Sequence, residues 1–198
     1  MKSYAIDEAG YAIDARQIAS PNFDTRAAHS TNEDSSTSTA DSISLIVIHN
    51  ISLPPNQYGG NGIIELFTNQ LNPAEHPYYA EIYTRKVSAH FLIRRDGELI
   101  QFVSCLNRAW HAGVSSWQGR ERCNDFSVGI ELEGSDFEAF EPAQYETLKK
   151  LTTNLISVYP IQAIVGHSDI APIRKTDPGP YFDWQSLATQ THNLAKAE

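Results

Sequence analysis

The chain has 198 residues, of which 41% are hydrophobic and 20% are charged, a composition typical of one globular domain with a proper core. Its formal net charge of -9, without a cluster of lysine and arginine, argues against binding to nucleic acid, because a phosphate backbone requires such clusters. The N-terminus lacks the apolar run of a signal peptide, and no segment reaches the length of a membrane span. Two cysteines are too few for a disulfide framework, so we expect reduced thiols and a cytoplasmic protein.

The first part of the chain changes character twice. Residues 1–28 mix apolar and polar side chains without a clean period, and we interpret them as an N-terminal arm packed on the core. Residues 29–44 consist largely of Ser, Thr, Asp and Asn, which predicts a flexible polar loop. Residues 45–190 hold the regular hydrophobic patterns and are expected to form the main domain.

The main domain opens with a short apolar run, Leu45–Ile48, that is typical of a buried central strand. This strand would deliver His49 and Asn50 at its end. After a loop rich in proline and glycine, apolar residues over 63–67 favour a short helix. The connection over 70–87 is long and has little regular pattern, so we expect it to be functional, as a lid over a site.

A hairpin is predicted next, because an Asp-Gly pair separates two alternating runs over 89–94 and 98–103. His90 lies inside the first of these strands, and we expect it to be a buried, hydrogen-bonded core residue. His111 follows in a loop of small residues. The residues leave open whether His111 is a ligand, a substrate contact or a packing residue.

The second half of the domain is predicted to contain a strand over 126–132, a helix over 142–159 and a strand over 161–165. Gly129 inside the first of these strands indicates a close approach of the backbone. Glu131 faces away from its apolar neighbours, so in a strand buried on both faces it must be paired, ligated or catalytic. The alternation of strands and helices predicts an α/β (α+β) fold, with helices covering a mixed central β-sheet.

Two more polar residues stand out near the end of the domain. His167 follows the last strand, and Asp177 precedes a Pro-Gly-Pro turn, so one interpretation is that they merely cap a strand and begin a turn. The alternative joins them to His49 in a zinc site, since two histidines and a carboxylate leave a fourth position for water. Glu131 would then accept the proton of the water, and Lys175 would stabilise the oxyanion. This arrangement predicts metal-assisted amide hydrolysis.

Long segments of the sequence resemble the zinc amidase family of N-acetylmuramoyl-L-alanine amidases, which also includes the peptidoglycan recognition proteins. The resemblance covers nearly the whole chain except the 29–44 loop and the last residues, and it implies a zinc amidase fold for residues 45–190. The segments that carry it are IHNISLPP (48–55), HPYYAEIYTRKVSAHFLIRRDGELIQFV (76–103), RAWHAGVSSWQGRERCNDFSVGIELEG (108–134) and GHSDIAPIRKTDPGP (166–180).

The resemblance implies one zinc ion per chain, held by His49, His167 and Asp177. It also implies that Glu131 positions and deprotonates water and that Lys175 stabilises the oxyanion. In the recognition-protein branch of the family, the third ligand is typically Cys, and a Tyr stands where this chain has Glu131. The chain is therefore similar to the amidase branch.

The implied substrate is small, a 1,6-anhydro-N-acetylmuramyl peptide cut between the lactyl carbonyl and L-alanine during peptidoglycan recycling in the cytoplasm. We expect a monomer, with neither nucleic acid nor membrane as a partner. In bacteria that have the circuit, such an enzyme would be expected to influence β-lactamase induction. The positions that match the substrate cleft of the family are Asn50, Lys86, Trp110, Arg122 and Ser168.

One of these positions departs from the family, because Lys86 stands where we expect Arg, and a bidentate contact with a carboxylate would become a point-charge contact. Arg122 would pair with a peptide carboxylate, and His111 would be a cleft or support residue rather than a ligand. Two alternatives remain: a muropeptide-binding sensor that does not cut, and an amidase that acts on intact wall outside the cytoplasm. A sensor would need neither Glu131 nor Lys175.

Overall fold

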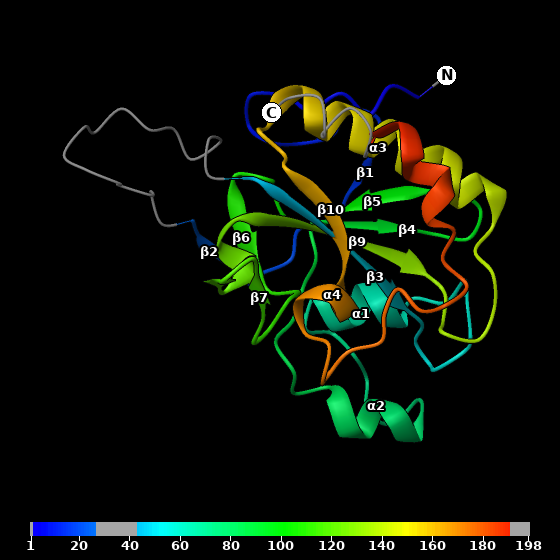
Figure 1. The fold of residues 1–198 in the computed structure, drawn as a ribbon. Helices are drawn as coiled ribbons and strands as arrows, with labels where there is room; N and C mark the ends of the chain where they lie inside the picture. Colours follow the sequence, from blue (N-terminus) through cyan, green and yellow to red (C-terminus); the bar gives the residue numbers. More distant parts are fainter. Residues whose placement is uncertain (1, 27–42, 191–198) are drawn as a thin grey trace.

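A six-stranded mixed β-sheet forms the centre of the protein, as seen in a computed structural model that describes residues 2–26 and 43–190 (Figure 1). In spatial order its strands are β1 (Arg16–Gln17), β5 (Leu99–Gln101), β4 (Phe91–Ile93), β9 (Ser127–Glu133), β3 (Leu45–Ile51) and β10 (Ala163–Gly166). Neighbouring strands are parallel except β4 and β5, which form the predicted hairpin. The predicted mixed sheet is confirmed.

Strand β3, which lies between β9 and β10, is buried because side chains from both of its faces pack into a core. Ile46 and Ile48 belong to the cluster that includes the buried residues of α3 (Pro142–Val158). Leu45 and Val47 belong to a separate cluster on the other face. Since successive side chains of a strand alternate between faces, His49 lies on the face opposite α3.

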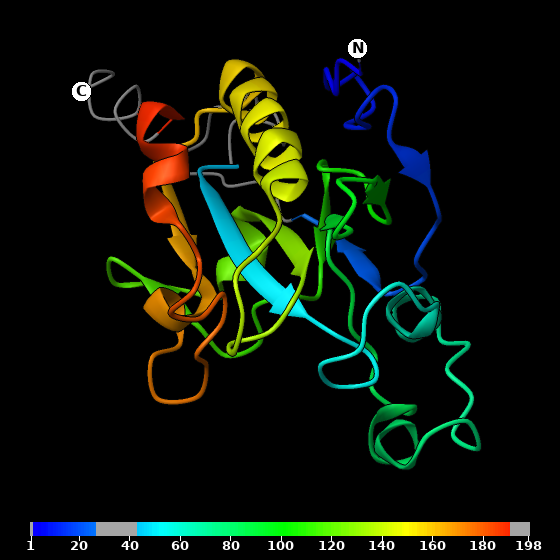
Figure 2. The same cartoon turned by 90° about the vertical axis from the view of Figure 1, so that its right-hand side faces the viewer.

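Helix α3 covers one face of the sheet (Figures 1 and 2). Its start is fixed by Pro142 and by Gln144, whose Oε1 accepts a hydrogen bond from the backbone N–H of Glu141 (3.0 Å). The Nε2 of Gln144 donates to the backbone of the sheet, at the carbonyl of Glu133 (3.0 Å). The predicted helix is confirmed to within one residue. Its fully buried stripe consists of Leu148, Leu151 and Leu155.

The opposite face of the sheet carries α1 (Gly62–Phe67) and the short α4 (His167–Ile170), while α2 (Pro77–Ile82) lies farther from the sheet (Figure 1). Helix α1 confirms the predicted short helix. Helix α2 lies in the connection over 70–87, where the sequence pattern predicts no regular structure. Its buried residues Tyr79 and Ile82 pack in one cluster with the buried residues of α1, so tertiary contacts favour this helix. That the connection acts as a lid stays a prediction.

Short elements that the sequence does not predict complete the fold. Their two to four residues are too few to show a period. Strand β2 pairs antiparallel with β6, and β7 pairs antiparallel with β8. These elements are β2 (Phe23–Thr25), β6 (Asn107–Ala109), β7 (Ser116–Trp117), β8 (Arg120–Glu121) and the 3-10 helices η2 (Cys123–Asp125) and η3 (Trp184–Leu187).

The N-terminal residues 2–26 contribute β1 to the edge of the main sheet and β2 to the small sheet with β6. Residues 29–42 of the predicted polar loop lie outside the described residues, and the division of the chain into arm, loop and domain stays a prediction. In the ranges 2–26 and 43–190, no helix is long and apolar enough to cross a membrane.

Candidate active site

Three neighbouring parallel strands bring the predicted site residues to one edge of the sheet. His49 lies near the end of β3, in register with Glu131 of β9. His167 follows directly after β10, the other neighbour of β3. The carboxyl ends of parallel strands meet at the same edge of a sheet, so residues that are far apart in sequence become neighbours. Asp177 joins them from the loop after α4, where its carbonyl accepts a hydrogen bond from the N–H of Ser168 (2.9 Å).

His49, His167 and Asp177 present three ligand atoms to one another. The Nδ1 atoms of the two histidines lie 3.0 Å apart, and each lies 3.0 Å from Oδ2 of Asp177. Three ligands at about 2.0–2.1 Å from a tetrahedral zinc ion would lie about 3.3 Å from one another. The spacing and chemistry of these three groups therefore fit a metal ion of this size.

The protonation states of these groups also suit a metal. Burial lowers the pKa of His49 to about 4, with His167 acting in the same direction against the opposing influence of Asp177. Burial alone would raise the pKa of Asp177, but its close contacts with His167 and His49 outweigh burial and hold that pKa well below its usual range. At neutral pH the site thus offers a neutral imidazole at His49 and an ionised carboxylate, the forms that bind metal ions.

Glu131 lies next to these three residues but is not one of them. Its side chain is buried, and among the described residues its Oε2 has no hydrogen-bond partner. Burial raises the pKa of Glu131 well above its usual value, the charge of Asp177 adds to this effect, and Lys175 opposes it. An unpaired buried carboxylate costs free energy, and such groups are often functional, so this oxygen is a candidate proton acceptor.

These groups line a cleft of about 350 Å³. Lys175 also lines this cleft. The cleft also has apolar lining residues, which come from α1, α2 and the loop before α1. These residues are Leu53, Pro55, Leu66, Phe67, Tyr78 and Ile82. The cleft thus joins a polar reactive end to an apolar surface, as small-molecule sites commonly do.

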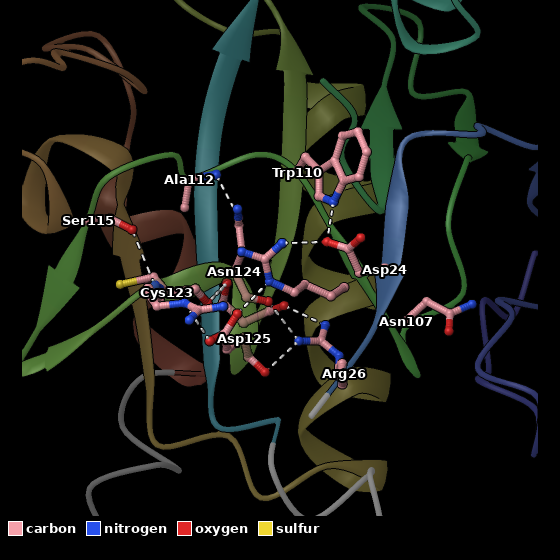
Figure 3. Close-up of polar contacts among 12 residues, drawn as sticks. Asp24, Arg26, Asn107, Trp110, Ala112, Ser115, Cys123, Asn124 and Asp125 are labelled. Carbon is pink, nitrogen blue, oxygen red and sulfur yellow. Dashed lines mark hydrogen bonds and ion pairs between the residues drawn. The ribbon is translucent and has the colours of Figure 1, made fainter. Parts of the chain in front are cut away.

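Asn50 and Trp110, two of the predicted substrate-binding residues, line this cleft. The Nδ2 of Asn50 donates to Oδ1 of Asp136 (2.7 Å) and to the carbonyl of Pro178 (3.1 Å), so Asn50 also holds the adjoining loops. The indole Nε1 of Trp110 donates to Oδ2 of Asp24 in the N-terminal segment (2.7 Å; Figure 3). This contact fixes the ring at the cleft.

Three other predicted substrate-binding residues, Lys86, Arg122 and Ser168, are not among the described residues that line the cleft. Lys86 and its neighbour Arg85 are both exposed, but Arg85 lines the cleft, which the sequence did not indicate. Arg122 forms an ion pair with Asp125 (3.1 Å) and lines a separate, more apolar hollow of about 650 Å³. The roles assigned to these residues stay predictions.

The two remaining histidines near the site differ in their roles. His90 is fully buried, and its Nδ1 accepts a hydrogen bond from the N–H of Gly129 (3.0 Å), which confirms the predicted core residue. His111 lines the cleft and contacts Nε2 of His49 through its Nδ1 (3.0 Å). A side chain on Gly129 would overlap the ring of His111, so the close approach predicted at this glycine is confirmed.

The fold and the site together define a class of protein: an α/β protein with a candidate catalytic metal centre of two histidines and one carboxylate, beside a buried free carboxylate. Residues 38–180 match the model of a protein family described as N-acetylmuramoyl-L-alanine amidase. The chain belongs to the N-acetylmuramoyl-L-alanine amidase family and is an enzyme of that class.

Its similarity to individual family members extends over most of the chain. It is 54% identical to the 1,6-anhydro-N-acetylmuramyl-L-alanine amidase AmpD of Escherichia coli over 179 residues, which are 89% of this chain and 92% of that protein. It is 51% identical to the AmpD of Haemophilus influenzae, over 90% of this chain and 92% of that protein. Full-length similarity at this level confirms the predicted membership of the amidase branch.

Solved structures agree with this assignment. The crystal structure of a selenomethionine AmpD derivative matches with a TM-score of 0.85 and 50% identity, covering 94% of this chain and 98% of that one. A structure of the amidase AmiD from E. coli, in complex with anhydro-N-acetylmuramic acid-L-Ala-D-γ-Glu-L-Lys as substrate, matches with a TM-score of 0.58 and 29% identity. That match covers 85% of this chain and 65% of the AmiD chain.

Proposed function

We propose that this chain is a zinc-dependent amidase that hydrolyses the amide bond between 1,6-anhydro-N-acetylmuramic acid and L-alanine in muropeptides. The observation that carries the proposal is the convergence of His49, His167 and Asp177 beside the free Oε2 of Glu131. The names of the AmpD relatives state this activity, and the substrate bound to AmiD contains the same sugar and the same L-alanine link, which supports the choice of substrate.

His49, His167 and Asp177 would hold the zinc ion, one per chain. A zinc ion held there would polarise the amide carbonyl and lower the pKa of water to about 7. The remaining chemistry falls to groups of the protein. With Asp177 ionised and His49 neutral, no proton has to leave these two ligands when the metal binds at neutral pH.

Glu131 would act as the general base. Its unpaired Oε2 would accept the proton of the attacking water, and the carboxyl group would then deliver this proton to the amide nitrogen that leaves with L-alanine. The raised pKa of Glu131 assists the first step, because a carboxylate with a higher pKa is a stronger base for the proton of water. One side chain thus serves both proton transfers.

Lys175 would stabilise the negative charge that develops on the carbonyl oxygen. Its ammonium group lines the same cleft and acts on the pKa values of both Glu131 and His49, so it lies within electrostatic reach of the reacting atoms. Around this centre, Asn50 and Trp110 would contact the substrate directly in the cleft. The roles of Lys86, Arg122 and Ser168 in binding the peptide remain part of the proposal.

The setting we propose is peptidoglycan recycling by a monomeric enzyme in the cytoplasm. Both cysteines, Cys105 and Cys123, are free and buried, which is compatible with a reducing compartment. A small muropeptide of the kind bound to AmiD, and also to the Pseudomonas aeruginosa protein AmpDh3 as an anhydromuramic pentapeptide, would be the only partner that the reaction requires.

The test is hydrolysis of a defined anhydro-muropeptide, followed by mass spectrometry of the released peptide. We expect release by the purified protein, loss of release after chelation, and recovery on addition of zinc but not of magnesium. The same peptide on a reducing N-acetylmuramic acid measures the preference for the anhydro sugar. Release that survives chelation would rule out the metal, and an absence of release from both sugars would rule out the substrate.

A further inference from the structure

A chain of hydrogen bonds runs from the metal-ligand cluster into the core. Nε2 of His49 lies 3.0 Å from Nδ1 of His111, and Nε2 of His111 lies 3.2 Å from Oγ of Ser127. The hydroxyl of Ser127 in turn donates to the carbonyl of Cys123 (2.6 Å). The rings of His49 and His111 are also in edge-to-face contact. The proposed amidase mechanism uses neither His111, nor Ser127, nor the carbonyl of Cys123.

The protons along this chain can be assigned from its far end. The carbonyl of Cys123 can only accept, so the Ser127 hydroxyl donates its one proton to that carbonyl. Its oxygen then accepts a hydrogen bond from Nε2–H of His111. A neutral imidazole has one N–H, so Nδ1 of His111 carries a lone pair. That lone pair accepts from Nε2–H of His49. The Nδ1 of His49 is then left without a proton, and it is the atom that faces His167 and Asp177.

The same short segment sets the second histidine ligand. Nε2 of His167 lies 3.0 Å from the carbonyl of Ala112, the residue after His111. Since a carbonyl only accepts, His167 carries its proton on Nε2 and presents an unprotonated Nδ1 to the cluster. Both histidine ligands are thus held in the metal-binding tautomer by two consecutive residues, one acting through its side chain and the other through its backbone.

This segment is itself held firmly. The Oδ1 of Asn124 accepts from the backbone N–H groups of both His111 (3.2 Å) and Ala112 (2.8 Å), and Figure 3 shows Asn124 beside Ala112. The buried guanidinium of Arg26 donates to the backbone carbonyls of Asn124 (3.0 Å) and Ser127 (2.7 Å), and so holds both of these residues in place. Gly129 leaves the space that the His111 ring occupies.

We propose that His111 is a positioning residue for the metal site, which with Ser127 fixes the tautomer of His49, while the carbonyl of Ala112 does the same for His167. The inference rests on the proposed zinc dependence and deepens it. Groups that orient metal ligands in this way typically change metal affinity by about 10- to 100-fold. The expected effect is therefore on zinc binding itself, and not only on turnover.

The experiment measures the zinc affinity of the apoprotein by competition with a chromophoric chelator. We expect His111→Leu to weaken zinc binding by about 10- to 100-fold, because Leu cannot accept from His49. His111→Gln retains an acceptor and a donor on one side chain and should recover most of that loss. Ser127→Ala should cause a smaller loss, while Ser115→Ala removes a hydroxyl bonded to Cys123 but not to His111, and should leave zinc affinity unchanged.

Nitrogen-15 NMR of the histidine side chains gives a second measurement that does not depend on activity. In the wild-type apoprotein, Nδ1 of His49 should show the shift of an unprotonated nitrogen, and His111→Leu should shift the population toward the other tautomer. Equal zinc affinity in wild type and His111→Leu would overturn the inference, and so would an equal loss in the Leu and Gln variants, which would point to packing alone. A wild-type protein that binds no zinc would instead overturn the proposed function.

Discussion

His49 and Glu131 lie opposite each other, in register, on the adjacent parallel strands β3 and β9. Residues paired in this way point to the same face of a sheet. The backbone of the sheet therefore holds the Glu131 carboxylate beside the candidate metal-ligand cluster, although Glu131 is not one of its three members. The position of His49 depends on strand pairing and on its own hydrogen bonds, and not on the Glu131 side chain.

It follows that Glu131 can be replaced without loss of the metal. We expect Glu131→Ala and Glu131→Gln to bind zinc with near wild-type affinity while losing roughly 100- to 10,000-fold in kcat, the usual contribution of a general acid–base group. Metal content after dialysis and single-turnover hydrolysis would be measured on the same samples. Loss of zinc from the Gln variant would show that Glu131 is a ligand and not the base.

Substitution of Lys175 tests the oxyanion role separately. Lys175→Met keeps most of the apolar stem but removes the ammonium, so charge on the carbonyl oxygen would no longer be stabilised. We expect kcat to fall by roughly 100- to 1,000-fold, with a smaller change in KM, because the interaction develops only in the transition state. A variant with raised KM and unchanged kcat would assign Lys175 to substrate binding instead.

Arg85 and Lys86 offer a matched pair for the carboxylates of the stem peptide. Arg85 lines the cleft and Lys86 does not, so Arg85→Ala should raise KM about tenfold for a tripeptide substrate, as expected on losing one charge-assisted hydrogen bond. Lys86→Ala should leave it nearly unchanged. Neither change should affect a substrate that carries L-alanine alone. The reverse result would return the role to Lys86, as the family resemblance predicted.

Arg85 and Lys86 also show which features of the site cannot be predicted from the sequence. The strand Leu45–Ile48 and the helix over 142–159 were predictable, because apolar residues recur there with the period of the element that forms. Arg85 and Lys86 lie just after α2 and before β4, outside any regular element. Without a period, the sequence cannot tell which of two adjacent cations lines the cleft.

The positions of two candidate ligands could be anticipated for a related reason, although the complete ligand set came from the family resemblance. His49 and His167 follow apolar runs directly, and in a parallel sheet such positions meet at one edge. The contacts that hold these candidate ligands were not predictable in this way. His111 reaches His49 through a fold that brings residues 62 positions apart into contact, and no local pattern indicates which of three roles its ring takes.

His90 provides a prediction about stability and pH that does not involve the metal. Burial lowers its pKa to about 3, the charge of Arg26 acts in the same direction, and the hydrogen bond to the carbonyl of Asn107 opposes both. In the unfolded chain the pKa is near 6.5. Between these values the unfolded state binds a proton that the folded state does not, so stability falls as the pH is lowered from about 6.5 toward about 3.

The contribution of His90 can be isolated by comparing the wild type with His90→Gln in zinc-free buffer. Gln can still accept from the N–H of Gly129 but does not titrate. Urea unfolding at pH 7, 6, 5 and 4 should show that the wild type loses about 1.4 kcal/mol more per pH unit than the variant once the pH is below about 6.5. The other titrating groups are common to both proteins and cancel in the difference. If the unfolding free energies of the two proteins fell in parallel with pH, His90 would be protonated in the folded state. The core would then hold a second buried cation next to Arg26.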